Sequence, residues 1–168
     1  GHVGAFREQK NHKFLLNVFS KLNIPNAELV LVGDGILKEK IVAQAQELGI
    51  KNKIKFLGSR NDINEILLSF DLFVMPSLWE GLSVSAIEAQ ASGLQLILSE
   101  NVSHSIKITP NVKFLNLNDI DSWIREIKSK VVDDKFDRKD ETKAISKYGY
   151  DMSNSAQIIR RIYSNEEI

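Results

Sequence analysis

The sequence has no cysteine, few prolines, no net charge and no long apolar run, and each of these absences excludes a class of protein. Without cysteine the chain can form neither a disulfide framework nor a thiolate metal site. Basic and acidic residues both number 22, so we expect no broad basic surface for nucleic acid. No apolar run approaches the roughly 20 residues of a membrane span, and no signal peptide is recognisable.

What is present describes an ordinary globular domain. Of the 168 residues, 43% are hydrophobic and 26% are charged, which is enough to build one real core. The chain begins with Gly1 rather than Met, and it begins inside an apolar segment. We therefore expect a single domain over residues 1–168 that forms one part of a longer protein.

Short apolar runs alternate with segments of helical periodicity through residue 118. The six expected strands are His2–Phe6, Glu28–Val32, Lys53–Leu57, Asp71–Met75, Leu94–Leu98 and Val112–Leu115. Helices are expected to begin after Asn11, Gly35, Asp62 and Ser83. This alternation implies right-handed crossovers, and nearly continuous apolar strands are typical of a sheet that is buried on both faces. The sequence thus predicts an α/β fold: a Rossmann-like parallel sheet of about six strands, with helices on both faces.

From about residue 119 the pattern becomes a helical extension. The segment from Lys128 to Lys143 carries many charges of both signs, which is typical of a solvated helix or loop. Near the end, apolar residues recur at helical spacing: Ile158, Ile159, Ile162 and Tyr163. We expect part of this last helix to be exposed or to contact a second copy, because a lone domain covers one side of it.

A candidate binding site follows the fourth expected strand. A short loop carries Glu80 and Gly81, and a helix then begins near Ser83. The start of a helix offers unpaired N–H groups, here those of Leu82, Ser83 and Val84, which suit a phosphate. Gly81 allows the backbone to approach such a ligand closely.

Two carboxylates flank this anion site. Glu80 precedes the helix and Glu88 lies within it, after a rise of roughly 7–8 Å from Ser83 at 1.5 Å per residue. They can therefore contact different ends of a ligand whose phosphates lie between them. A nucleotide sugar has this layout, with ribose hydroxyls at one end and sugar hydroxyls at the other.

Glu80 and Glu88, separated by seven residues, resemble the E-x7-E signature of retaining glycosyltransferases with the GT-B fold (group 1, family four). The similarity extends over residues 75–82, Met-Pro-Ser-Leu-Trp-Glu-Gly-Leu, and over residues 87–93, Ile-Glu-Ala-Gln-Ala-Ser-Gly. It spans residues 1 to about 165. The resemblance implies the C-terminal, donor-binding half of a GT-B fold, with an N-terminal acceptor domain absent from these residues.

The resemblance also implies roles for single residues. Lys10 matches the lysine that pairs with the donor diphosphate, and a surface lysine beside a helix start is the alternative. Glu80 matches the glutamate beside the donor sugar, which holds sugar hydroxyls and helps to stabilise an oxocarbenium-like transition state. Glu88 matches the glutamate that holds the ribose hydroxyls. Gly58 and Arg60 lie where the family places the nucleobase, although Arg60 fits a solvated loop equally well.

One departure from the family concerns the first loop. The family usually has an arginine directly after the glycine there, and this chain has Ala5. The missing guanidinium removes a bidentate phosphate contact worth about 1.5–3 kcal/mol. A binding module without catalysis therefore stays open as an alternative. A GT-B epimerase or phosphorylase is a separate alternative.

No cofactor is expected beyond the substrate itself. The three histidines, His2, His12 and His104, show no metal-ligand spacing, and no Asp-x-Asp motif is present, so we predict no metal site. The first strand is not followed by Gly-x-Gly-x-x-Gly, and Gly33-Asp34-Gly35 is too short a match, which argues against a nicotinamide site. The expected donor is a nucleotide-diphospho-sugar, with UDP favoured over GDP.

The resemblance implies transfer of a sugar, with retention, to a polysaccharide or lipid-linked acceptor. Residues 9–12, Gln-Lys-Asn-His, and 110–114, Pro-Asn-Val-Lys-Phe, are similar to enzymes of bacterial capsular and exopolysaccharide synthesis. We accordingly expect a cytoplasmic protein that works at the inner membrane face through its full-length form. The chain alone is expected to bind nucleotide weakly and to turn over poorly.

Overall fold

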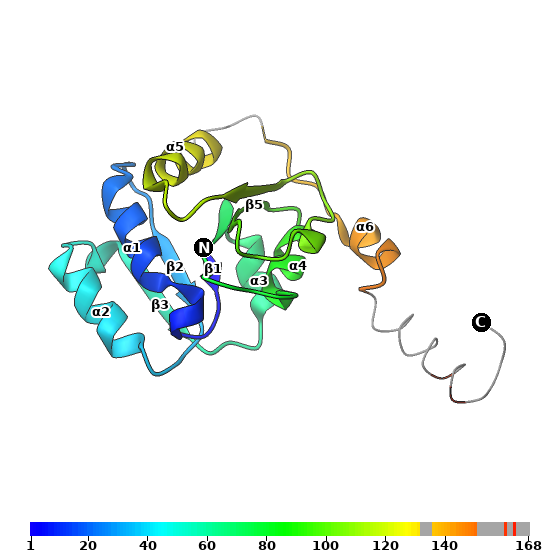
Figure 1. Ribbon diagram of the computed structural model, residues 1–168, viewed down its shortest axis with the longest axis horizontal. Helices are drawn as coiled ribbons and strands as arrows, with labels where there is room; N and C mark the ends of the chain where they lie inside the picture. The colour runs from blue at the N-terminus through cyan, green and yellow to red at the C-terminus, as the bar shows by residue number, and fades with distance from the viewer. Residues whose placement is uncertain (132–135, 151–159, 161–162, 164–168) are drawn as a thin grey trace.

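The computed structural model describes residues 1–131, 136–150, 160 and 163 (Figure 1). Of the residues expected in the last helix, Ile158, Ile159 and Ile162 lie outside the described part of the chain. Tyr163 is described, and its side chain is 87% exposed. The contact predicted for that helix therefore stays a prediction.

Six parallel strands form the centre of the molecule. They are β1 (His2–Val3), β2 (Leu29–Val32), β3 (Ile54–Gly58), β4 (Leu72–Met75), β5 (Gln95–Ser99) and β6 (Val112–Leu115). Hydrogen bonding divides them into two sheets of three, in the orders β1-β2-β3 and β4-β5-β6, and every pairing is parallel. The expected positions of the strands agree with these bounds to within one residue, except that β1 is three residues shorter.

The two sheets meet where β1 lies beside β4. The Val74 N–H donates to the Gly1 carbonyl at 2.9 Å, and the Gly1 amino group donates to the Leu72 carbonyl at 2.6 Å. A single six-stranded sheet was expected; because β1 is only two residues long, it makes too few bonds to β4 for one continuous ladder. Read across this junction the order is 3-2-1-4-5-6, that of a doubly wound fold, with its switch point between β1 and β4. The predicted fold class is thus confirmed.

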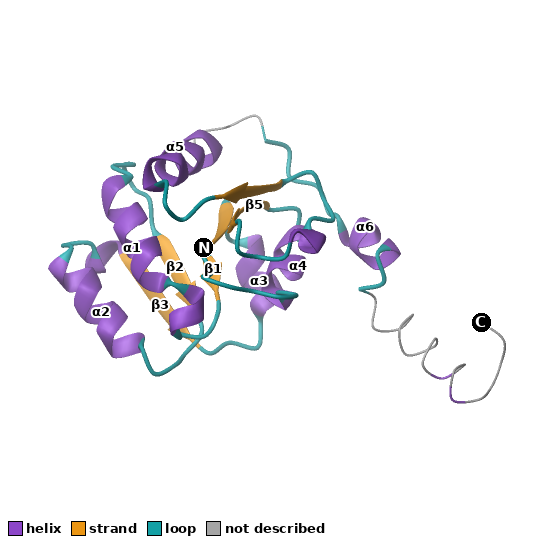
Figure 2. Cartoon of the chain, in the orientation of Figure 1, coloured by secondary structure: helices purple, strands orange, loops and turns teal. Residues whose placement is uncertain are grey.

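Helices cover both faces of the strands, as Figure 2 shows. They are α1 (His12–Lys21), α2 (Lys38–Glu47), α3 (Ile63–Leu68), α4 (Val84–Ala91), α5 (Ile120–Val131) and α6 (Thr142–Lys147), with short 3-10 turns at Glu8–Lys10, Lys51–Lys53 and His104–Ile106. The first core cluster joins α1, α2 and α5 to one face, and the second joins α3, α4 and α6 to the other.

Strand β4 shows why both faces are covered. Leu72 and Val74 point into the first cluster, whereas Phe73 and Met75 point into the second, as the two-residue period of a strand requires. All four side chains are at most 5% exposed. This explains the unbroken apolar run in the sequence.

The charged segment from Lys128 to Lys143 is mostly exposed where it is described, as expected of a solvated stretch, but one of its side chains makes an ordered contact. Arg138 is partly buried, and its guanidinium donates to the carbonyls of Leu67, Leu68, Phe70 and Ser92. Helix α6 follows and contacts α4, with Ile145 in the second core. We call this contact of Arg138 with four backbone carbonyls the Arg138 clamp. The sequence did not predict it, because backbone carbonyls are the same at every position.

Candidate functional site

The loops that follow β1 and β4 meet at the switch point, and an ion pair joins them. Lys10 Nζ lies 2.6 Å from Glu80 Oε2, and the two side chains are only 14% and 13% exposed. Ligands of open α/β sheets bind at this edge, beyond the carboxyl ends of the strands. The structure thus brings together two of the predicted site residues that are 70 positions apart.

Further bonds hold the two loops in register. The Leu78 N–H donates to the Gln9 carbonyl at 2.8 Å, and Gln9 Nε2 donates to the Trp79 carbonyl at 3.1 Å. These bonds join the residue directly before Lys10 to the two residues directly before Glu80. Gln9 was not predicted as a site residue; its position directly before Lys10 is the only signal in the sequence.

The backbone of Glu80 is also held from its other side. Its N–H donates to the Asn101 carbonyl at 3.3 Å, and its carbonyl accepts from the Ser103 N–H at 3.1 Å. These bonds form a parallel bridge between Glu80 and Val102. The sequence did not predict this contact of the loop after β5 with Glu80.

The amino end of α4 lies next to Glu80. Ser83 occupies the N-cap position, yet its hydroxyl does not cap the helix; it lies 3.6 Å from Met75 Sδ and 3.2 Å from Ser85 Oγ. Among the described residues, the N–H groups of Leu82, Ser83 and Val84 have no hydrogen-bond acceptor. An uncapped helix start with free donors suits an anion.

Gly81 is not required by the protein's own packing. Its φ is not in the left-handed region, and a Cβ added there would meet nothing within 4 Å. The neighbouring side chains of Leu82 and Val84 are 53% and 64% exposed. The surface in front of the helix start is therefore open to a ligand.

Glu88 lies one turn into α4 and is half-buried. No described residue donates a hydrogen bond to its carboxylate, and burial raises its pKa above the usual range. The side chain lines a cavity of about 580 Å³ between α3 and α4, together with Asn64 and Leu68. An unpaired, partly desolvated carboxylate in a cavity is a candidate ligand contact.

The predicted nucleobase residues lie at the end of β3. Gly58 adopts a left-handed φ of +69°, and its carbonyl accepts from the Gly33 N–H at 2.8 Å. Arg60 is exposed and forms a two-bond ion pair with Asp62, with Nε to Oδ1 at 2.8 Å. This geometry does not test a contact with a base, so the role of Arg60 stays a prediction.

Two glycines of the loop after β2 support the loop that carries Ala5. A Cβ on Gly33 would lie 2.2 Å from the Gly4 carbonyl oxygen, and one on Gly35 would lie 2.7 Å from the Phe6 carbonyl oxygen. The Phe6 N–H donates to the Asp34 carbonyl at 3.0 Å. The Gly-Asp-Gly segment thus lets two loops pack backbone to backbone.

Two buried histidines lie beneath the ion pair. The rings of His2 and His12 meet edge to face at 4.8 Å, and His2 Nδ1 lies 2.8 Å from the Val74 carbonyl. Burial, followed by the charge of Lys10, lowers the pKa of His12 to about 4, and burial also lowers the pKa of His2. Both rings are therefore neutral at pH 7 and act as packing residues.

Arg7 does not occupy the place of the missing arginine. It lines a separate cavity of about 600 Å³ formed with residues of α1 and α2, including His12 and Ile41. Ala5 therefore leaves Lys10 as the cation of this loop that contacts Glu80.

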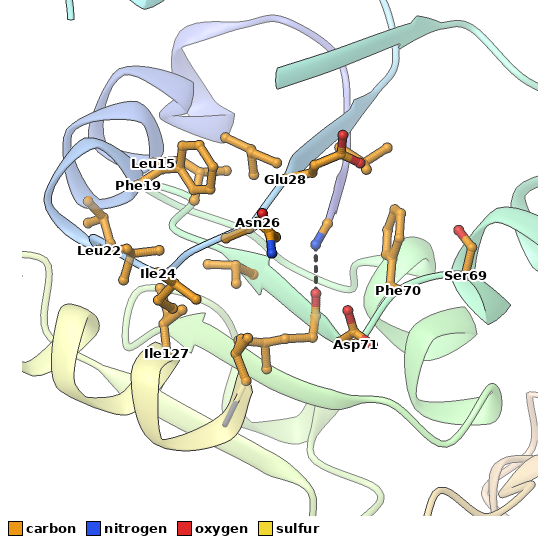
Figure 3. A pocket seen from close by; sticks show the side chains of 18 of the residues that line it. Leu15, Phe19, Leu22, Ile24, Asn26, Glu28, Ser69, Phe70, Asp71 and Ile127 are labelled. Carbon is orange, nitrogen blue, oxygen red and sulfur yellow. Dashed lines mark hydrogen bonds between the residues drawn. The ribbon is translucent and has the colours of Figure 1, made fainter. Parts of the chain in front are cut away.

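A further cavity of about 300 Å³ lies at the amino ends of β1, β2 and β4, the edge opposite Glu80. Figure 3 shows its apolar wall, formed by side chains such as Leu15, Leu22 and Ile127. It shares no residue with the Lys10–Glu80 site. In the described part of the chain, no group of three His, Asp or Glu side chains could hold a metal ion. Nor does that part contain a helix long and apolar enough to cross a membrane.

Comparison with known families gives a match over most of the chain. The model described as glycosyl transferases group 1 matches residues 1–152. A Bacillus subtilis (strain 168) protein named as a glycosyltransferase, EpsF, is 34% identical over 168 residues, covering 98% of this chain and 44% of the relative. An Escherichia coli protein named UDP-Gal:alpha-D-GlcNAc-diphosphoundecaprenol alpha-1,3-galactosyltransferase is 37% identical over 141 residues, covering 79% and 36%. The chain thus spans less than half the length of these relatives.

Solved structures show the same fold. Anabaena Alr3699/HepE in complex with UDP-glucose has a TM-score of 0.79 at 20% identity, covering 98% of this chain and 48% of that one. The lipopolysaccharide outer core galactosyltransferase WaaB in its apo form has a TM-score of 0.76 at 21% identity, with the same coverage.

Proposed function

Because the chain belongs to the group 1 glycosyltransferases, we propose that it is the donor-binding domain of an enzyme that moves a sugar from a nucleotide diphosphate to an acceptor hydroxyl. One observation carries the proposal: the Lys10–Glu80 pair adjoins the uncapped start of α4, and the unpaired Glu88 lies one turn further along the same helix. A cation, an anion-binding helix end and two carboxylates match the parts of a nucleotide sugar.

The diphosphate is proposed to bind at the amino end of α4. The N–H groups of Leu82, Ser83 and Val84 would donate to its oxygens, and Gly81 leaves the space that it needs. Lys10 would then stabilise the charge that develops on the leaving phosphate. The lysine can do so without a large movement, because its present partner, Glu80, lies at the same edge.

The two carboxylates are proposed to read the two ends of the donor. Glu80 would accept hydrogen bonds from sugar hydroxyls and stabilise positive charge at the anomeric carbon as the bond to phosphate lengthens. Glu88 would accept both ribose hydroxyls, which supply the hydrogen-bond donors that it lacks in the described structure. Gly58 and Arg60 would border the base.

The proposals for the donor nucleotide and the acceptor are based on the names of the relatives. The Escherichia coli relative is named for UDP-Gal and for a lipid-linked acceptor, and the Anabaena structure holds UDP-glucose. We therefore propose a UDP-hexose donor, transfer with retention and a polysaccharide or lipid-linked acceptor on the cytoplasmic side of the membrane. The chain alone is proposed to bind donor and turn over slowly, since the acceptor would belong to the domain that these residues do not match.

A binding module without catalysis is the second candidate, and Ala5 is the observation that favours it. No second cation of the first loop contacts Glu80 in the described structure, so the leaving phosphate would have weaker stabilisation. Transfer of labelled sugar from UDP-hexose by the full-length protein distinguishes the two, and NMR of the anomeric proton in the product tests retention.

Titration calorimetry with UDP tests the donor site. We expect Glu88→Gln to weaken UDP binding about tenfold, because an amide accepts hydroxyl protons less strongly than a carboxylate. EDTA should leave the affinity unchanged. Glu39→Gln, on the exposed face of α2, is the control and should bind as the wild type does. Equal affinities for Glu88→Gln and the wild type, with both folded, would remove Glu88 from the site.

A further inference from the structure

Residues 136–141, which precede α6, contact the carboxyl ends of α3 and of α4, the helix that carries Glu88. Arg138 Nε donates to the Ser92 carbonyl at 2.7 Å, just beyond α4. Nη1 donates to the carbonyls of Leu68 and Phe70 at 3.1 and 2.9 Å, and Nη2 donates to that of Leu67 at 2.9 Å, all at the end of α3. One guanidinium therefore joins the carboxyl ends of both helices.

The chemistry of this contact requires arginine. The last carbonyls of a helix lack partners within the helix and carry partial negative charge. A guanidinium presents five donors in a rigid planar fork, so it can bond to carbonyls from two directions at once. A lysine ammonium carries the same charge but has three donors on a flexible stem, and it cannot span both ends in the same way.

The backbone of the same segment is packed tightly against the end of α4. The Glu141 N–H donates to the Ala91 carbonyl at 3.1 Å. A Cβ on Gly93 would lie 1.9 Å from the Lys139 carbonyl oxygen, and Gly93 has a φ of +72°. Only glycine permits this approach, so backbone contacts of Lys139 and Glu141, directly after Arg138, hold this segment against the end of α4.

This clamp lies one helical turn from Glu88. The Ser92 N–H and hydroxyl both donate to the Glu88 carbonyl at 3.0 Å, and the Ser92 carbonyl accepts from Arg138. The cavity of about 580 Å³ that Glu88 lines extends from Asn64 on α3 to Arg138. Arg138 and Glu88 therefore line the same cavity, whose wall includes residues of both α3 and α4.

We propose that Arg138 is a positioning residue for the ribose site: by joining the ends of α3 and α4, it places the Glu88 carboxylate where both hydroxyls of a nucleoside diphosphate can reach it. The inference rests on the proposed function, which assigns the ribose to Glu88. The inference adds Arg138 to the site, a residue that is 50 positions after Glu88 and that the E-x7-E motif does not predict.

The test compares UDP with 2′,3′-dideoxy-UDP by calorimetry on the 168-residue chain. The wild type should favour UDP by roughly 10- to 100-fold, the value of hydrogen bonds to a charged group. In Arg138→Met this preference should fall below about threefold, while affinity for the dideoxy analogue stays within about threefold of the wild type. Arg125→Met, which removes an exposed guanidinium from α5, is the matched control and should keep the full preference.

Arg138→Lys keeps the test decisive if the methionine variant does not fold. Its preference for UDP should lie between those of the wild type and of a variant without the ribose contact. In a Glu88→Gln background the same lysine substitution should change UDP affinity by less than about twofold, because the contact that it positions is already weakened. A merely structural arginine would lower the midpoint of thermal unfolding and leave the ratio of the two affinities unchanged.

The results of these titrations distinguish a failure of the Arg138 inference from a failure of the proposed function. If the wild type prefers UDP and the Arg138 variants keep that preference, Arg138 has no part in the ribose site and the proposed function stands. If Arg138→Lys weakens UDP binding by the same factor in the wild-type chain and in the Glu88→Gln chain, Arg138 does not act through Glu88. If the wild type binds both nucleotides equally, the ribose role of Glu88 fails and the inference fails with it.

Discussion

At the scale of single residues, charge organises the site. Lys10 and Glu80 are each mostly buried and neutralise each other at 2.6 Å. Removing either partner would leave the other charge without compensation in a partly desolvated place, which costs more than an exposed pair would contribute. The pair therefore helps to hold the loops after β1 and β4 together.

The first prediction concerns Ala5. In Ala5→Arg a guanidinium would be added to the loop of Lys10, and we expect it to tighten UDP binding about tenfold through a charged phosphate contact. Affinity for uridine should not change, and the gain should shrink as salt is added. Ala27→Arg, in the loop before β2 at the opposite edge, adds the same charge as a control. An equal gain for uridine, or for the control, would contradict a local contact.

Gly81 supports a second prediction at this scale. A methyl group there meets no protein atom within 4 Å, so Gly81→Ala should change the free energy of unfolding by no more than about 0.5 kcal/mol. It should nevertheless weaken UDP binding several-fold, because the methyl group would occupy the space before the start of α4. Urea denaturation and calorimetry on one preparation measure both quantities. A stable variant that binds UDP normally would place the phosphates elsewhere.

At the scale of elements, the site depends on loops that support one another. The loop after β1 carries Lys10, rests on the loop after β2 and is bonded to the loop after β4. Because these contacts are mostly backbone to backbone, glycine is needed where the chains approach most closely. The Gly33-Asp34-Gly35 segment is too short to indicate a nucleotide motif. Its glycines instead allow the loop after β2 to pack against the backbone of the loop after β1.

We predict that Gly33→Ala unfolds more easily than the wild type by at least about 2 kcal/mol, since its Cβ would overlap the Gly4 carbonyl. Gly49→Ala is the matched control: it also has a positive φ, but a Cβ there meets nothing within 4 Å. The control should lose only about 1 kcal/mol, the cost of the backbone conformation. If urea denaturation gives the two variants equal losses in the free energy of unfolding, the positive φ accounts for the loss and the clash does not.

Elements and site differ in how far the sequence predicts them. The strands were predictable because each is an apolar run between breaks, and β6 has the expected bounds. The family resemblance assigned Lys10 and Glu80 to one donor site, but it did not predict that the two side chains form an ion pair. Gln9, Ser103 and Arg138 were not predictable, because their partners are backbone groups brought close only by the tertiary fold.

At the scale of the whole molecule, the fold joins two three-stranded halves through β1 and β4. The Lys10–Glu80 pair lies at that junction, and so does the buried pair His2–His12, which packs on Phe6 and Phe73. The stability of the molecule and the integrity of the site therefore depend on the same few residues. Acid should reveal this dependence, because protonation of either ring places a charge in the core.

The last prediction is a loss of stability between pH 6.5 and 4. The pKa of His12 is about 4 in the folded chain and about 6.5 when unfolded, so the unfolded state binds more protons in this range. Stability is fully present above pH 6.5 and falls as the pH drops; His2, whose pKa is also lowered, acts in the same direction. From pH 7 to pH 5 we expect a loss of about 2 kcal/mol in urea denaturation. His12→Phe keeps a ring against Phe6 but cannot ionise, so its loss should be smaller. If the variant and the wild type lose stability in parallel, acid acts at groups other than His12.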